Sequence, residues 1–471
     1  MLPMCSRLVH SKSWLLLSAI IALLVPQTLA AGISVDFANP ESIKSAASTV
    51  AYDLVSFYSG NNSGDTPGNL PSPYYWWEAG AFFGALVNYW SYTGDDSYNE
   101  ITKQAIIHQA GVKGDFMPAN QTYTEGNDDQ CFWALTAIIA AERNFPSPPD
   151  HVPDWLAMVQ GVFNQQAHRW HNDTCGGGLK WQIYHWNAGY LYKNSIANGC
   201  FFDISSRLGR YTGNKTYGEW AVKVWNWSET IGLLSPKYEV FDGVTEVDNC
   251  SSHDHNRWSY NAGVWLHGAS VMYNWTAETP EDSLGTSSIW LNRTNGLLKA
   301  ANHFFSKTNV MVEPICEFTS SCNTDQLSFK AYLSRWLAEV TQYAPHTYDT
   351  IMSTKLRPTA EAAVAQCQGG ETGTFCGFKW SSGKYDGTIG VGEQMGVLEL
   401  LTGLLVANVG GPLTASTGGN SEGNSAAGTG EDEPDTELPT IHIDGGDRAG
   451  AAILTVLFIS LIAGAVYTMI S

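Results

Sequence analysis

The sequence predicts a mainly α-helical domain that folds as one large helical toroid. Apolar residues recur at three- and four-residue spacing in many segments, which is typical of helices with one buried face. No segment shows the sustained apolar–polar alternation of a half-buried strand. About a dozen helices in a region of about 375 residues fit a toroid better than a short four-helix bundle, given typical helix and loop lengths.

The clearest helix is expected at 41–59, where Pro40 lies in the first turn and Gly60 just past the end. The segment 76–92 is apolar nearly all round, which suits a helix packed on two sides. Tyr-Thr-Gly sequences at 92–94 and 211–213 are expected to end helices, with Gly as the C-cap. Similar patterns predict further helices at 131–143, 155–164, 187–210, 217–231, 262–274, 291–305, 325–340 and 390–407.

The composition excludes two classes of protein. The 471 residues include 45 acidic and 25 basic ones, for a net charge of −20, so there is no basic excess to bind nucleic acid. Aromatic residues make up 12%, far more than a disordered chain contains.

The N-terminus resembles a secretory signal over 1–31. Arg7 and Lys12 precede a short apolar run at 14–24, and small residues at 28–31 suit cleavage. The alternative, an uncleaved anchor helix, is disfavoured because the run is too short to span a bilayer comfortably.

The C-terminus carries a second apolar run, at 449–470, without a basic tail after it. Small residues followed by a short polar spacer and this run predict a glycosylphosphatidylinositol (GPI) attachment signal, with Asp444 or Gly445 as the attachment residue. A single-pass membrane anchor is the alternative, and it lacks the usual cytoplasmic Lys or Arg.

These ends set the expected domain organisation. A signal peptide occupies 1–31 and the folded domain 32–409. The Gly-, Ser-, Thr- and Glu-rich segment 410–444 is expected to be a flexible stalk, and 445–471 the removed GPI propeptide. The protein is therefore expected on the outer face of the plasma membrane, held by a GPI anchor.

Cysteine and asparagine patterns agree with secretion. Cys5 lies in the signal, and eight further cysteines suggest disulfides, with Cys316–Cys322 and Cys367–Cys376 as local pairs. The pairing of Cys131, Cys175, Cys200 and Cys250 stays open, and a zinc site lacks suitable spacing. Glycosylation sequons occur at Asn61, Asn120, Asn172, Asn214, Asn226, Asn249, Asn274 and Asn292.

The candidate chemistry lies in the segment Gly126-Asn127-Asp128-Asp129-Gln130. Asn127 is expected to cap a helix with Gln130 completing a capping box, so that both aspartates lie in its first turn. Two carboxylates so close cannot both ionise freely, so one pKa should rise relative to the other. Their side chains could lie about 5 Å apart, as in a retaining glycosidase. Acidic residues are also common at helix starts for stability alone.

Aromatic and amide side chains favour the catalytic interpretation. Flat rings stack on sugar C–H groups, and amides both donate to and accept from hydroxyls. Individually each is more often structural. His185, His253, His255 and His267 show no metal-binding spacing, and this chemistry requires no cofactor. The candidates are Tyr74, Tyr75, Trp76, Trp77, Trp181, Tyr184, Trp186, Tyr190 and Tyr260, with the amides Gln182, Asn187, Asn194, Asn198 and Asn261.

Across nearly the whole folded region the chain resembles glycoside hydrolase family 76, specifically its fungal GPI-anchored cell-wall members, the mannan endo-1,6-alpha-mannosidases. The motifs that carry the resemblance are Tyr75-Trp76-Trp77-Glu78-Ala79-Gly80, Asn127-Asp128-Asp129, Gly177-Gly178-Leu179-Lys180-Trp181-Gln182, Lys193-Asn194-Ser195-Ile196-Ala197-Asn198-Gly199, Tyr260-Asn261-Ala262-Gly263 and Ser328-Phe329-Lys330.

The resemblance implies an (α/α)6 barrel and a retaining mechanism, with Asp128 as nucleophile and Asp129 as general acid/base. It implies an α-1,6-mannan substrate or the mannose core of GPI glycans, and wall glucan as a possible acceptor in cell-wall biogenesis. Whether water or a sugar accepts the mannosyl group stays open. The implied substrate-binding residues are Trp76, Trp77, Asn127, Gln182, Asn194, Asn198, Tyr260, Asn261 and Lys330.

Two other classes stay open. One is a catalytically inert carbohydrate-binding wall protein. The other is a uronate- or glucan-processing enzyme on the same toroid, because a fold alone does not fix the substrate.

Overall fold

The computed structural model describes residues 32–429 and 455–462. The chain divides after Thr429 into two units. The second unit is described only as a short helix at 455–462. The predicted signal peptide and the GPI attachment residues lie outside the described residues. None of the described helices combines the length and hydropathy needed to cross a bilayer.

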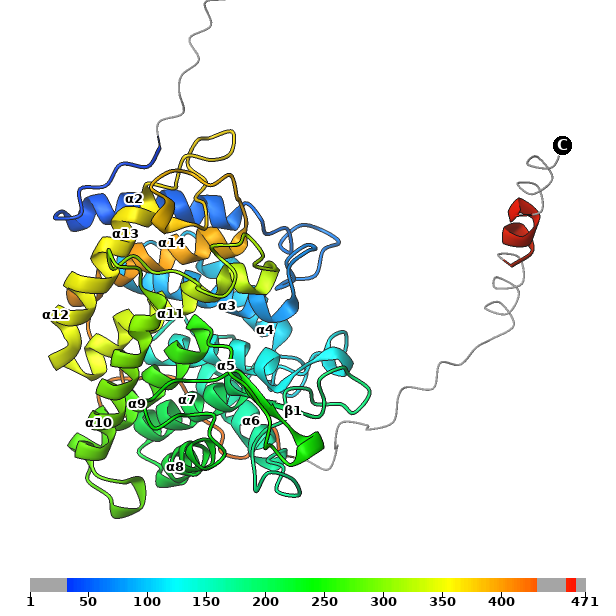
Figure 1. Cartoon of the computed structure of the whole chain (residues 1–471), viewed down its shortest axis with the longest axis vertical. Helices are drawn as coiled ribbons and strands as arrows, with labels where there is room; N and C mark the ends of the chain where they lie inside the picture. Colours follow the sequence, from blue (N-terminus) through cyan, green and yellow to red (C-terminus); the bar gives the residue numbers. More distant parts are fainter. Residues whose placement is uncertain (1–31, 430–454, 463–471) are drawn as a thin grey trace, which may run out of the picture. The chain divides into compact units, whose positions relative to one another are not determined.

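The first unit is a double ring of helices (Figure 1). Each inner helix packs against the next, and the last packs against the first, which closes the ring. The inner helices are α3 (Trp76–Thr93), α5 (Asn127–Glu142), α7 (Ser195–Thr212), α9 (Ser259–Glu278), α11 (Thr324–Tyr343) and α14 (Val391–Gly403). The predicted helical toroid is confirmed.

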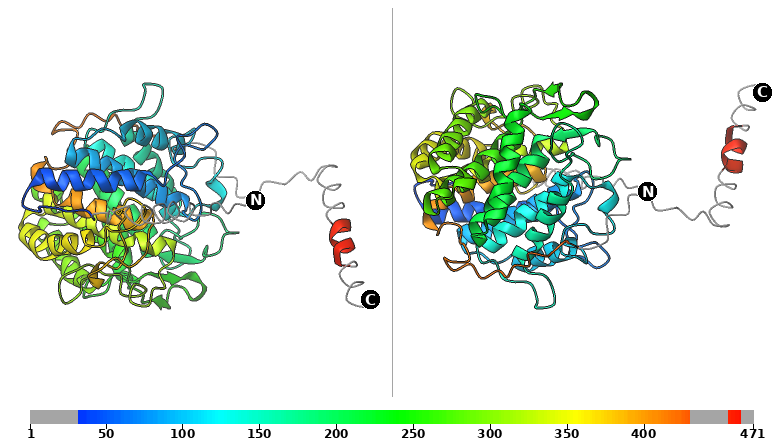
Figure 2. Two further views of the ribbon diagram at one scale, coloured as in Figure 1. Left: turned by 90° about the horizontal axis from the view of Figure 1, so that it is seen from above. Right: turned by 90° about the horizontal axis from the view of Figure 1, so that it is seen from below.

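An outer layer of helices covers this ring, as the views from above and below show (Figure 2). Its helices are α2 (Pro40–Val55), α4 (Asn99–Gln109), α6 (Trp155–His168), α8 (Lys215–Thr230), α10 (Ser287–Ala300), α12 (Tyr348–Ile351) and α13 (Arg357–Val364). A π-helical segment, Met352–Leu356, joins the last two. Short 3-10 turns lie at Thr122–Thr124, Glu246–Asp248, Asp282–Leu284, Ala301–Phe304, Pro345–Thr347, Trp380–Ser382 and Val406–Asn408.

Most predicted helices are present, and apart from the start of the one at 187–210 their ends differ from the prediction by up to five residues, as in α2, which ends at Val55 rather than at 59. The segment predicted as a helix at 187–210 begins as a loop and a strand, and becomes helical only at Ser195. Helix α5 begins at Asn127, the residue that was expected to be its N-cap. Helices α4, α12 and α13 were not predicted, because α4 is polar on average and α12 and α13 have only four and eight residues. Gly94 and Gly213 end helices in the left-handed conformation, as expected.

A small antiparallel sheet lies at the end of the ring where α7 begins. Its strands are β1 (Tyr192–Asn194), β2 (Gly243–Thr245) and β3 (His253–Asp254), in the order β1-β2-β3. Asn194 pairs with Gly243 across the first two strands. The sheet therefore brings the start of α7 next to residue 242, about 50 positions further along the chain.

Charged side chains fill the centre of the ring at the level where α5 ends. Arg207 is ion-paired with Glu142, and Arg335 donates to Glu399 at 2.7 Å. His267 lies between Asp203 at 2.7 Å and Glu339 at 3.1 Å, and these carboxylates raise its pKa to about 9. His267 thus has a structural role as one partner in a buried ion-pair network.

Three disulfides cross-link the unit. The predicted local pairs Cys316–Cys322 and Cys367–Cys376 are present, and Cys175–Cys250 is a third. Cys131 and Cys200 are buried free thiols. Of the eight predicted sequon asparagines, seven are exposed. Asn274 is half-buried, and its Oδ1 accepts a hydrogen bond from Arg210.

Residues 410–429, which we call the strap, are folded against the domain. The prediction of a flexible stalk from Gly410 onward is wrong for this part, and the first unit extends to Thr429. Low hydropathy misled the prediction, because the strap is held by hydrogen bonds rather than by an apolar face. Its backbone bonds the end of α5 at Glu142 and the end of α7 at Tyr211, then follows α6 past Leu156, Gln160 and Asn164.

Ser421 anchors the strap, and we expect Ser421→Ala to lower the free energy of unfolding by about 1 kcal/mol, as loss of a helix cap does. Its Oγ accepts from the backbone N–H of Leu156 in the first turn of α6, at 2.9 Å. Ser425→Ala is the matched control, because Ser425 is exposed and bonds Asn164 only through its backbone carbonyl. Chemical denaturation checks both variants, and equal losses would contradict the role of Ser421.

Candidate active site

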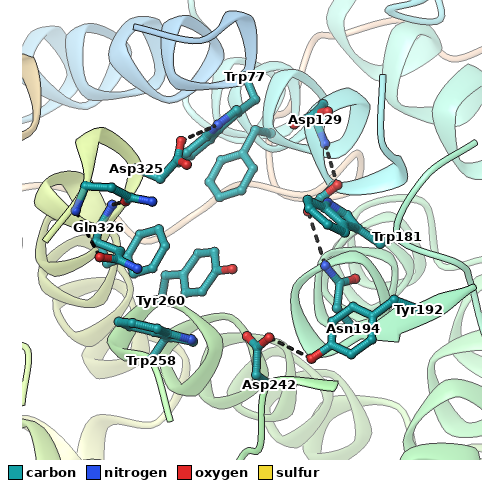
Figure 3. Close-up of a pocket in the computed structure, with 14 residues that line it drawn as sticks. Trp77, Asp129, Trp181, Tyr192, Asn194, Asp242, Trp258, Tyr260, Asp325 and Gln326 are labelled. Atoms are coloured by element: carbon teal, nitrogen blue, oxygen red, sulfur yellow. Dashed lines mark hydrogen bonds between the residues drawn. The ribbon is translucent and has the colours of Figure 1, made fainter. Parts of the chain in front are cut away.

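A pocket opens at the end of the ring where the inner helices begin (Figure 3). Five helices supply its lining from their N-caps or first two turns, so the positive ends of their dipoles converge on it. This field favours negative charge in the pocket. The lining residues are Trp77, Asp128, Asp129, Phe132, Trp181, Tyr192, Asn194, Asp242, Trp258, Tyr260, Asn323, Asp325, Gln326 and Phe329.

Asp128 and Asp129 occupy the first turn of α5, as predicted, but the cap differs from the prediction. Gly126 is the N-cap residue, and the carboxylate of Asp129 accepts its backbone N–H at 2.7 Å. The side chain of Asn127 instead bonds Arg169 and the carbonyl of Lys180. The capping interaction therefore fixes the orientation of one of the two candidate catalytic carboxylates.

Gly126 is required here by close approach. A Cβ at this position would lie 2.4 Å from Asp128 Oδ1, 2.9 Å from the carbonyl oxygen of Trp181 and 3.2 Å from Asp129 Oδ2. A larger residue would displace both carboxylates, which explains a glycine directly before the Asn-Asp-Asp sequence.

Burial raises the pKa of both aspartates. The pKa of Asp128 lies well above its usual range because the side chain is buried and the charge of Asp129 is adjacent. The pKa of Asp129 rises to about 6, because burial is partly offset by the N–H of Gly126. Burial of the adjacent carboxyls therefore favours a proton shared by this pair in the free protein.

Asn194 connects the aspartates to α7. Its Oδ1 caps the helix by accepting the N–H of Ala197 at 3.2 Å, and its Nδ2 donates to Asp128 Oδ2 at 3.4 Å. One side chain therefore both starts α7 and orients a candidate catalytic carboxylate.

Two further carboxylates face the pocket (Figure 3). Asp325 accepts the indole N–H of Trp77 at 3.1 Å, and burial raises its pKa. Asp242 accepts from Tyr192, and burial together with the charge of Asp254 raises its pKa to about 6. No Lys or Arg is among the described residues that line this pocket.

Aromatic rings form much of the remaining wall. Tyr260 stacks on Phe329 with ring centroids 3.8 Å apart and an interplanar angle of 4°. Trp77 packs on Phe132 on the other side. Ring faces and carboxylates together match the apolar and hydroxyl surfaces of a sugar.

The structure brings six of the predicted site residues to the pocket and leaves the others outside its lining. Asp128, Asp129, Trp77, Trp181, Asn194 and Tyr260 line it. Trp76 bonds Gln109, Asn198 bonds backbone at Leu179, and Lys330 is buried in an ion pair with Glu317. Gln182 accepts from Asn187. The side chain of Asn127 bonds Arg169 and the carbonyl of Lys180. Asn261 donates a hydrogen bond to the carboxylate of Asp242.

Several lining residues were not predicted. Asp325 had a signal, because it starts a predicted helix just before the Ser328-Phe329-Lys330 motif. Tyr192 likewise directly precedes the motif that begins at Lys193. Asp242 had no such signal, since only the pairing of β1 with β2 brings it to the pocket. No group of three or more His, Cys, Asp or Glu side chains in the described part of the chain is arranged to hold a metal ion.

The sequence itself matches the model of glycosyl hydrolase family 76 over residues 42–416. The chain belongs to glycosyl hydrolase family 76. A Saccharomyces cerevisiae protein named mannan endo-1,6-alpha-mannosidase is 45% identical over 439 residues, which cover 92% of this chain and 95% of the relative. A putative mannan endo-1,6-alpha-mannosidase of Schizosaccharomyces pombe is 44% identical, over 85% of this chain and 89% of the relative. This family 76 chain is a glycoside hydrolase.

Solved structures of the family agree with the fold. The crystal structure of Dfg5 from Chaetomium thermophilum, in complex with glucosamine, matches with a TM-score of 0.79 and 45% identity, and covers 84% of this chain and 97% of that one. An inactive variant of an α-1,6-mannanase from Salegentibacter, in complex with α-1,6-mannotriose, has a TM-score of 0.58 and 15% identity, with 77% of this chain and 99% of that one covered. The (α/α)6 assignment is thereby confirmed.

Proposed function

We propose that this family 76 enzyme cleaves α-1,6-mannosidic bonds within a chain, with retention of configuration, through Asp128 and Asp129. The single observation that carries the proposal is the placement of two adjacent carboxylates at the start of α5 in the pocket wall. The names of the relatives, and the mannotriose bound to the Salegentibacter enzyme, support α-1,6-mannan as the substrate class.

The proposed reaction has two steps. Asp129, protonated, donates its proton to the leaving glycosidic oxygen while Asp128 attacks the anomeric carbon and forms a mannosyl-enzyme. Asp129 then removes a proton from the acceptor hydroxyl as that oxygen attacks the same carbon. The acceptor is water in hydrolysis and a sugar hydroxyl in transfer.

These roles require the shared proton to lie on Asp129 and Asp128 to be ionised when substrate is in place, whereas burial raises the pKa of both carboxyls in the free protein. A glycosidic oxygen beside Asp129 favours a proton on that residue, because it accepts a hydrogen bond only from the protonated form. Asn194 supports it as well, since its N–H₂ group stabilises a charged Asp128.

One experiment tests the proposed function directly. The full chain is incubated with an α-1,6-manno-oligosaccharide, and NMR follows the anomer of the first product, with and without a β-glucan oligosaccharide as acceptor. We expect internal cleavage that yields the α-anomer first. A first product with the β-anomer would contradict the proposal. So would a protein that cleaves another linkage but leaves α-1,6 linkages intact.

The ionisation of the acid/base gives a pH prediction. The charge of Asp325 raises the pKa of Asp129, so Asp325→Asn should lower that pKa. Since the general acid must be protonated, the alkaline limb of the kcat/KM profile is expected to move to lower pH. Asn can still accept the indole N–H of Trp77. A pH series on one manno-oligosaccharide checks this, and an unmoved or upward-shifted limb would contradict it.

We further propose that the enzyme acts at the cell surface, where a GPI anchor attached at Asp444 or Gly445 holds it. The apolar tail, the small residues before it and the N-terminal signal support this location. There the mannose core of GPI glycans and wall glucan are accessible as donor and acceptor. Release of the protein from cells by a phosphatidylinositol-specific phospholipase tests the anchor.

A further inference from the structure

The loop before β2 places Asp242 across the pocket from the catalytic pair (Figure 3). Its backbone is pinned on both sides. The carbonyl oxygen of Asp242 accepts the N–H of Ser195 at 2.7 Å, and its own N–H donates to the carbonyl of Asp254 at 3.1 Å. The carboxylate therefore has a fixed origin relative to the start of α7.

Two neutral donors orient this carboxylate. The hydroxyl of Tyr192 donates to Oδ2 at 2.8 Å, and Nδ2 of Asn261 donates to Oδ1 at 3.2 Å. No Lys, Arg or His in the described part of the chain forms an ion pair with it. Desolvation of a half-buried carboxylate costs free energy when no cation is paired with it. A ligand that donates hydrogen bonds would offset this cost, so the carboxylate at the pocket surface indicates a ligand.

The carboxylate has capacity left for such a ligand. An ionised carboxylate offers about four acceptor positions, and Tyr192 and Asn261 use two of them. Each oxygen thus keeps one acceptor position. Two neighbouring hydroxyls of a sugar ring present two donors side by side, which matches the two oxygens of one carboxylate.

We propose that Asp242 binds a pair of neighbouring hydroxyls on the mannose ring held in the pocket, and so determines which sugar the enzyme accepts. This inference rests on the proposed function. It gives the pocket two opposite walls with separate tasks. The Asp128–Asp129 wall breaks the bond, and the Asp242 wall selects the ring by its hydroxyl pattern.

A purely structural role would make a different prediction. If Asp242 only joined Tyr192 to Asn261, its substitution would slow every substrate by the same factor. If it binds hydroxyls, the loss depends on whether the substrate carries those hydroxyls.

The test compares Asp242→Asn with the unchanged protein on an α-1,6-manno-oligosaccharide and on its 2-, 3- and 4-deoxy analogues at the ring in the pocket. We expect Asp242→Asn to lower kcat/KM on the parent about 10- to 150-fold, the range for a hydrogen bond to a charged group. For the unchanged protein, removal of the hydroxyl at one or two neighbouring positions should lower kcat/KM by a similar factor. For Asp242→Asn, removal of the same hydroxyls should lower kcat/KM less than about threefold, because the carboxylate contact to them is already lost.

Tyr192→Phe is the matched control. It removes one support but keeps the carboxylate, so its discrimination among the deoxy analogues should resemble that of the unchanged protein. Equal losses for Asp242→Asn across all analogues, or full activity in that variant, would overturn the proposal. Failure of the unchanged protein to cleave the parent would instead refute the proposed function. Binding of the same analogues to Asp128→Asn protein, measured by calorimetry, then tests Asp242 without turnover.

Discussion

Replacement of Asp128 by Asn is expected to slow cleavage of α-1,6-manno-oligosaccharides on the order of 10⁴-fold or more, the scale typical of losing a nucleophile. The substitution keeps the shape of the side chain and an acceptor for Nδ2 of Asn194, so the fold should persist. Steady-state kinetics measures the loss, and circular dichroism confirms that the variant is folded.

Azide separates the role of Asp128 from a merely electrostatic one. In Asp128→Ala the small anion can occupy the space of the carboxylate and displace an activated aryl leaving group from an α-1,6-mannobioside. Because no mannosyl-enzyme precedes this attack, the product should be the β-azide, with inverted configuration. An α-azide from this variant would assign the nucleophile to Asp129 instead.

Replacement of Asp129 by Ala is expected to slow cleavage of unactivated manno-oligosaccharides by about 10²- to 10⁴-fold, the range for loss of a general acid. Aryl α-1,6-mannobiosides with good leaving groups need no proton, so formation of the mannosyl-enzyme from them should be far less affected. The intermediate should then accumulate, since no base activates the acceptor. A burst of aryl release followed by slow turnover is the measurement.

Azide again supplies the control. Attack on the accumulated mannosyl-enzyme inverts the anomeric carbon a second time, so Asp129→Ala should yield the α-azide. Asp129 also accepts the N–H of Gly126, and its loss removes one cap of α5. Thermal unfolding therefore accompanies the kinetics. Equal slowing of aryl and unactivated substrates would contradict an acid/base role.

The fold could be predicted well because helical periodicity is a local property of the sequence. Helix α3 was expected within one residue at its end, and its termination at Gly94 follows from the left-handed conformation that glycine adopts readily. The capping pattern at Asn127 was misassigned by one residue, because a backbone contact at Gly126 leaves no signature in side-chain chemistry.

The site could be predicted only in part. The paired aspartates are adjacent in sequence, so local reasoning finds them. Lys330 shows the opposite case. It lies in a family motif but is buried between Glu317 and two aromatic rings, which a sequence pattern cannot distinguish from a pocket position. Asp242 depends on strand pairing across a long separation, and no local signal marks it.

The strap determines where the proposed anchor pulls on the molecule. A chain leaving at Gly410 would begin its path to Asp444 beside Glu142, opposite the pocket mouth, with 35 residues that reach about 120 Å at most. The strap instead runs along α6 as far as Asn164, one turn before the end of that helix. The same end of α6 contacts Asn127 through Gln166 and Arg169. Only 15 residues then separate Thr429 from the proposed attachment at Asp444, and they span about 50 Å at full extension. The proposed anchor would thus pull on the outer helix α6, beside Gly161 and Asn164, and not on the end of the ring opposite the pocket.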